Sequence, residues 1–174
     1  MLFLGWELFP LILIYWLENA VIGLYTIIKM LTCSDSEHFI KKLFMSAFFT
    51  FHFGMFWYGH GTFVVGIFGD DSYQVSQAYQ LIVDYGLQMA VIALLISHGF
   101  SLIQNFYIGS ESRELKVEKI MFSPYKRVVV LHVFIIFGGM VLQSIGVTQV
   151  GLIILAVIKI IADLIAHKME HRRV

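Results

Sequence analysis

Long apolar runs separated by short polar segments dominate the pattern along this chain. Five such runs occur, at about residues 3–29, 43–68, 78–108, 125–145 and 148–167. A helix that crosses a bilayer needs about 20 predominantly apolar residues, and each run reaches that length. The runs do not show the strict alternation of polarity that is typical of membrane β-strands. The pattern therefore predicts five membrane-spanning α-helices.

The amino-acid composition agrees with this interpretation. Hydrophobic residues make up 59% of the 174 residues and charged residues 14%, whereas an average soluble domain has about 25% charged residues. Helices are favoured because every backbone polar group in lipid must find its partner within the segment. The first run has no preceding basic residue and no small-residue cleavage site, so it is expected to be a retained helix. We predict an all-α, polytopic integral membrane protein with a single domain, residues 1–174.

The distribution of lysine and arginine predicts the orientation. With five spans, the segments after the first and third helices and the C-terminal tail share one side of the membrane, and each contains basic residues. The N-terminus, the loop GDDSYQVSQ and the turn near Gly146 share the other side and contain none. The positive-inside rule then places the N-terminus outside and the C-terminus in the cytoplasm. We expect a multi-pass protein of the cell (inner, cytoplasmic) membrane, surrounded by membrane lipids.

Several polar residues lie within the predicted spans at similar depths. With a rise of about 1.5 Å per residue, Glu18 falls close to the midplane of the first helix. One candidate ligand on each of the other four helices falls about 4–8 Å to the cytoplasmic side of the midplane. These residues are His52, His98, His132 and Asp163. His167 lies one turn deeper than Asp163 on the same helix face.

Histidines and a carboxylate at one level suggest a metal site. Three nitrogen or oxygen ligands with one open position are typical of catalytic zinc, and two histidines with one carboxylate suit non-haem iron. We therefore hypothesise a site for a divalent zinc or iron ion in the cytoplasmic half of the bundle. Its candidate ligands are His52, His98, His132, Asp163 and His167.

Two further residues are candidates for catalytic roles at that site. Glu18 would act as a general base or would orient a ligand, and His60 would lie on the approach from outside. Such a site suits hydrolysis or oxidation of an amphiphilic or lipid-soluble substrate. The sequence leaves open whether the protein is an enzyme at all.

Other interpretations of the same residues remain open. Each histidine alone is consistent with hydrogen bonding between helices, and Asp163 with an ion pair to Lys159. His60 also suits the outer aromatic belt of a membrane protein. Axial histidines for haem b, a proton relay or transporter, and a non-enzymatic subunit that packs on a membrane partner are the alternative functions. A homo-oligomer is compatible with the pattern, and a nucleic-acid partner is not expected.

The residues just discussed also carry a family resemblance. The strings YWLENAVIG, HFGMFWYGHG, SHGFSLIQNFY, SPYKRVVVLH and KIIADLIAHKMEH resemble an uncharacterised group of prokaryotic multi-spanning proteins, described as a domain of unknown function. The residues that match are Glu18, Asn19, His52, His60, His98, Asn105, His132, Asp163 and His167. The resemblance supports the choice of these residues and implies no particular activity.

Overall fold

The computed structural model describes residues 8–34, 38–69, 73–109, 111–129 and 132–133. The chain divides into two compact units, residues 1–127 and 128–174, and nearly all of the described residues belong to the first. The described residues form helices and turns and include no β-strand, so the predicted all-α class is confirmed for this part of the chain.

The first unit contains three long helical segments and several short ones. In chain order these are α1 (Leu8–Thr32), α2 (Phe39–Phe68), η1 (Val75–Gln77), α3 (Ala78–Asp84), α4 (Gln88–Ser101), η2 (Leu102–Ile108), α5 (Glu111–Glu114) and α6 (Val117–Phe122). The first two long helices agree with the first two predicted runs to within a few residues at most boundaries.

The third predicted run, 78–108, is not one continuous helix. It is interrupted between α3 and α4, where Gly86 has a φ of 64°. This left-handed conformation is readily available to glycine and ends the helix. Beyond α4 the chain continues directly as η2, a segment of π-helix. The run is long and predominantly apolar, which favours one continuous helix, although Asp84, Gly86 and Gln88 stand where it is interrupted.

The number of membrane spans is only partly tested. Among the described residues, two helical segments are long and apolar enough to cross a membrane, Phe9–Thr32 and Gln88–Ile108. Helix α2 is long enough but less hydrophobic than these two segments. Its two histidines, its glycines, Trp57 and Tyr58 lower its mean hydropathy. The run 125–145 is described only at residues 125–129 and 132–133, which are helical, and 148–167 lies outside the described residues.

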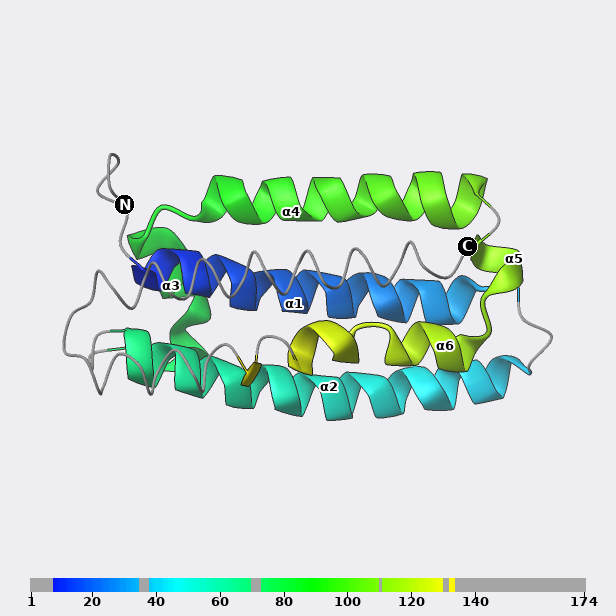
Figure 1. Ribbon diagram of the computed structural model, residues 1–174, viewed down its shortest axis with the longest axis horizontal. Coiled ribbons are helices and arrows are strands. Elements are labelled where there is room, and N and C mark those ends of the chain that lie inside the picture. Colours follow the sequence, from blue (N-terminus) through cyan, green and yellow to red (C-terminus); the bar gives the residue numbers. More distant parts are fainter. Residues whose placement is uncertain (1–7, 35–37, 70–72, 110, 130–131, 134–174) are drawn as a thin grey trace. The chain divides into compact units, whose positions relative to one another are not determined.

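Helix α1 lies between α2 and α4 in the first unit (Figure 1). Its side chains Leu13, Trp16 and Met30 are completely buried. Trp16 stacks on Trp57 of α2 with ring centroids 4.4 Å apart and an interplanar angle of 7°. Each indole N–H donates to the backbone carbonyl of the other tryptophan, at 2.8 Å from Trp16 and 3.1 Å from Trp57. This tryptophan pair, Trp16 with Trp57, joins α1 to α2.

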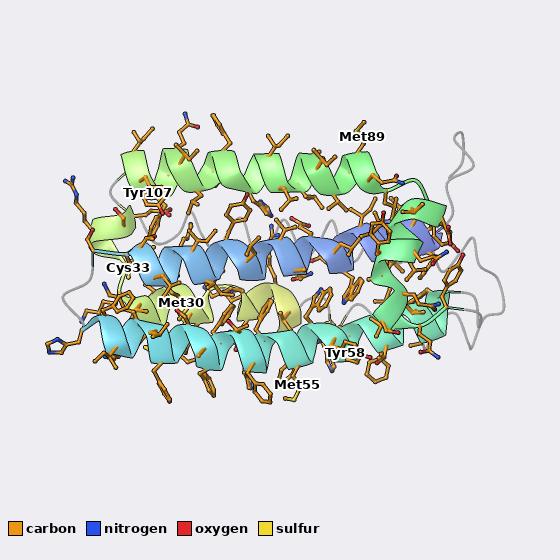
Figure 2. The ribbon with its side chains drawn as sticks, turned by 180° about the vertical axis from the view of Figure 1, so that it is seen from behind. Met30, Cys33, Met55, Tyr58, Met89 and Tyr107 are labelled. Carbon is orange, nitrogen blue, oxygen red and sulfur yellow. The ribbon has the colours of Figure 1, made fainter. Side chains whose placement is uncertain are left out.

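The outward sides of α2 and α4 are apolar. Met55 of α2 and Met89 of α4 point away from α1 (Figure 2), and they are 56% and 78% exposed. On α4 and η2 the exposed residues Met89, Ile92, Ile96 and Ile103 recur at spacings of three, four and seven residues. This spacing places them on one side of the helix. The first unit thus exposes long apolar surfaces on helices that lie on either side of α1.

We predict that Gly61→Ala destabilises the first unit, because Gly61 lies directly against the tryptophan pair. A Cβ there would lie 2.5 Å from Cζ2 of Trp16 and would also collide with Val75. Overpacking of this kind typically costs about 1–3 kcal/mol. The measurement is thermal or denaturant unfolding of the purified protein.

Gly59→Ala is the matched control, since a Cβ at Gly59 meets no atom within 4 Å. Alanine there should leave stability unchanged or raise it by up to about 1 kcal/mol through its higher helix propensity. Equal effects of the two substitutions would contradict the packing of Gly61 against Trp16.

Candidate functional site

Three ionisable side chains from different segments meet at Glu18 of α1. Glu18 Oε1 lies 2.8 Å from Arg127 Nη1 and 3.6 Å from His98 Nε2 of α4. We call Glu18, His98 and Arg127 the Glu18 centre. One carboxylate oxygen therefore faces a permanent cation and a titratable imidazole.

The segment after α5 brings Arg127 to this position. Helix α6 buries Val117, Ile120 and Met121 and packs on both α1 and α2 (Figure 1). A new helical turn then begins at Pro124, whose carbonyl accepts a hydrogen bond of 3.0 Å from the N–H of Arg127. Proline suits the first turn of a helix because its missing N–H is not needed there. From α5, which lies near the C-terminal end of α1, the chain thus returns along the bundle to Glu18.

Close packing between α1 and α4 positions His98. Tyr25 of α1 donates a hydrogen bond of 2.8 Å from its hydroxyl to the carbonyl of Leu95. The rings of Tyr25 and His98 meet edge to face, with centroids 6.3 Å apart. A side chain at Gly99 would come within 2.9 Å of the Tyr25 hydroxyl, so the glycine permits this approach. Tyr25 therefore sets the spacing that brings His98 beside Glu18.

The three side chains differ in their access to water. The side chain of Glu18 is 19% exposed and that of His98 24%, whereas Arg127 is 52% exposed. His98 Nε2 itself is buried and has no hydrogen-bond partner among the described residues, because Glu18 Oε1 is beyond hydrogen-bond distance. A charge taken out of water is stabilised mainly by its paired charge. Glu18 has that pair in Arg127, which still reaches solvent.

His52 of α2 takes part in a separate contact. A hydrogen bond of 2.8 Å joins His52 Nδ1 and the hydroxyl of Tyr125. The His52 ring stacks on Phe48 at a centroid distance of 5.4 Å, and the Tyr125 ring meets Phe49 and Phe53 edge to face. For His52, hydrogen bonding between segments is the interpretation that the geometry supports.

His60 is buried within α2, with 5% of its surface exposed. Its Nδ1 donates a hydrogen bond of 2.7 Å to the carbonyl of Phe56, one turn earlier in the same helix. The catalytic roles suggested for His60 and Glu18 stay predictions, because no contact described here tests them.

The predicted metal site is wrong. In the part of the chain that the structure describes, no group of three or more His, Cys, Asp or Glu side chains could hold a metal ion. His52 and His98 belong to helices on either side of α1, so their similar depth does not bring them together. Each imidazole instead has its own neighbour, Tyr125 or Glu18.

The remaining predicted ligands belong to the second unit. His132 is an exposed residue of the second unit, and Asp163 and His167 lie outside the described residues. The zinc or iron ion and the metal-dependent enzyme are therefore withdrawn. Haem b is withdrawn as well, because an axial pair needs two imidazoles that face each other, and His52 and His98 do not.

Sequence reasoning missed Arg127 and Tyr125 as partners within the bundle. Arg127 lies at the start of the fourth predicted run, directly after the basic segment that the positive-inside rule assigns to the cytoplasmic side. A usable signal was present, since Glu18 is the only Asp, Glu, His, Lys or Arg between Phe9 and Lys29. A carboxylate in an apolar helix requires a cation or a proton. The argument indicates that a cation lies beside Glu18, and the structure identifies this cation as Arg127.

The site and fold define an all-helical protein with apolar helices and an internal carboxylate. A family described as a family of unknown function (DUF6498) matches residues 1–174, so the chain belongs to that family. No curated protein and no solved structure matches it. Membership confirms the resemblance to an uncharacterised family but assigns no activity.

We predict that Arg127→Gln lowers the free energy of unfolding by about 1–2 kcal/mol. This value lies between those for exposed and buried ion pairs, because Arg127 is half-exposed. Lys126→Gln is the control, since it removes the same charge from an exposed neighbour. The double variant Glu18→Gln with Arg127→Gln should lose less free energy of unfolding than the sum of the losses in the two single variants. Additive losses, measured by equilibrium unfolding, would contradict the pair.

Proposed function

We propose that the protein is a multi-pass helical membrane protein that relays protons through its bundle by way of the Glu18 centre. One observation carries this proposal: a single oxygen of Glu18 lies within 4 Å of both Arg127 and His98. Ionisable residues inside membrane bundles face the interior, pair with one another and commonly form proton paths. A proton relay requires no metal and no cofactor.

The exposed surface of the first unit supports a membrane location. Large apolar side chains cover the outward side of α2 in addition to that of α4. Those more than two-thirds exposed on α2 are Ile40, Phe44 and Phe51. A soluble monomer rarely exposes apolar patches larger than a few hundred Å². In a membrane, lipid acyl chains would cover these surfaces, so the apolar side chains would not be exposed to water.

The arrangement of charges supports the proposed orientation. Basic residues gather where α1 ends and α2 begins, with Lys29 paired to Glu111 at 3.4 Å and Lys41 to Glu118 at 2.9 Å. The opposite end, around α3, has Asp84, whose carboxylate accepts a 2.7 Å hydrogen bond from the Tyr73 hydroxyl. The positive-inside rule places the basic end in the cytoplasm. Five spans, an outside N-terminus and the cytoplasmic membrane complete the proposal.

The geometry of the Glu18 centre suits proton exchange. At 3.6 Å, His98 Nε2 and Glu18 Oε1 are somewhat beyond hydrogen-bond distance. A small side-chain rotation would bring them to the 2.6–3.2 Å or so at which a proton passes, directly or through one water. A proton on Glu18 removes the charge that holds Arg127, and loss of that proton restores it. Proton uptake is thereby linked to the position of Arg127.

We predict that cysteines at the two ends of the bundle react from opposite sides of the membrane. Cys33 itself is buried and suits labelling poorly, so the background is Cys33→Ala. His38→Cys, at an exposed position of the basic end, should react with a membrane-impermeant maleimide from the cytoplasmic side only. Ser76→Cys, exposed in η1, should react from outside only. The reverse pattern contradicts the orientation, and reaction of both from one side contradicts the spans.

We predict that proteoliposomes containing the protein conduct protons down an imposed pH gradient, and that Glu18→Gln lowers this flux by about 100-fold, the lower range for loss of a general acid or base. The readout is the fluorescence of a pH-sensitive dye inside the vesicles. His98→Gln should lower the flux as well, because the imidazole is the neighbouring proton carrier.

Glu111→Gln is the matched control for this experiment. It makes the same chemical change in an ion pair with Lys29 at the end of the bundle, and the flux should be unchanged. A wild-type protein that conducts no protons, or a Glu18→Gln protein with full flux, would leave Glu18 and Arg127 as an ion pair that only joins segments.

A further inference from the structure

Helix α6 has an outward stripe that differs from its buried side. Val117, Ile120 and Met121 are buried against α1 and α2. Lys116, the residue that precedes the helix, Lys119 and Phe122 are exposed and recur every three residues. Within the helix this spacing places Lys119 and Phe122 on the same side, and Lys116 precedes Lys119 by the same interval. We call Lys116, Lys119 and Phe122 the α6 stripe.

The two lysines of the stripe carry positive charge that the described part of the chain does not neutralise. The nearby carboxylates Glu111 and Glu118 are already paired with Lys29 and Lys41. No ion pair is described for Lys116 or Lys119. Anions from outside the protein can therefore approach both ammonium groups.

Exposed aromatic side chains lie in the stripe itself and at the start of α2. Phe122 is 61% exposed and follows Lys119 by one helical turn. The ion pair between Lys41 and Glu118 brings α6 beside the start of α2, where Phe44 is 73% exposed. Cations next to exposed aromatic side chains are typical of the boundary between lipid headgroups and acyl chains.

We propose that the α6 stripe binds the headgroup of an anionic phospholipid at the cytoplasmic surface, with the phosphate at Lys116 and Lys119 and the acyl chain against Phe122. This inference rests on the proposed membrane function and adds a ligand class to it. A lipid fits better than a free phosphate because the apolar residues beside the lysines would be covered by the acyl chain. It also fits the preference of basic segments near a membrane for anionic headgroups.

The experiment measures dissociation constants of phosphatidylglycerol and phosphatidylcholine for the full chain in detergent, by native mass spectrometry. The wild-type protein should bind phosphatidylglycerol more tightly. Lys116→Gln with Lys119→Gln should weaken that binding by about fivefold per lysine, the factor that corresponds to ~1 kcal/mol per basic residue. Binding of phosphatidylcholine should stay unchanged, whereas Phe122→Ala should weaken both lipids.

Lys126→Gln is the charge control, because Lys126 is exposed but lies beyond Pro124, outside the stripe. It should change phosphatidylglycerol binding by less than twofold. Equal affinity of the wild-type protein for the two lipids would overturn the proposal. So would an undiminished affinity of the double variant, a loss in Lys126→Gln as large as in Lys119→Gln, or displacement of the lipid by inorganic phosphate at equal concentration.

Alkaline carbonate treatment of membranes separates this proposal from the membrane function on which it rests. Protein that carbonate extracts is not an integral membrane protein, and both proposals then fail. Protein that resists extraction but shows no preference for phosphatidylglycerol loses only the lipid site at α6.

Discussion

The central constraint on this fold is a carboxylate in the middle of an apolar helix. The side chain of Glu18 is only 19% exposed, and a carboxylate with so little access to water is stabilised mainly by a cation beside it. Arg127 is that cation, at 2.8 Å. The course of the chain after α5 allows this contact, since α6 packs on α1 and α2 and the turn at Pro124 brings the guanidinium to Glu18.

The residues around Glu18 join α1 to each of its neighbours. Two residues before Glu18, Trp16 exchanges hydrogen bonds with the backbone of Trp57 on α2. Glu18 itself faces Arg127 and, on α4, His98. Tyr125, two residues before Arg127, bonds to His52 of α2. The turn that holds Tyr125 and Arg127 is thus attached to α1 through Glu18 and to α2 through His52, and both attachments involve ionisable side chains.

Periodicity and composition predicted the elements more accurately than their contacts. Long apolar runs give the helices, because hydrophobic length is a property of each segment alone. The depth of a residue along its helix can also be calculated from the sequence. Depth does not determine the direction in which the side chain points around the helix axis. His52 and His98 were therefore assigned to one cluster, although α1 lies between their helices. Gly86 and Arg127 were missed for a related reason, since their effects depend on tertiary contacts or on the backbone conformation of one residue.

The same contacts explain how a proton relay could operate without loss of the fold. The tryptophan pair and the bond from Tyr25 to the Leu95 carbonyl are hydrogen bonds to backbone carbonyls and involve no carboxylate, imidazole or ammonium group. They hold α2 and α4 on α1 whether or not Glu18 is charged. In the proposed cycle, protonation of Glu18 therefore weakens only the attachment of Arg127, which is already half-exposed to water. A scaffold of uncharged contacts around one titratable pair allows local movement of the Arg127 turn while the three long helices remain packed.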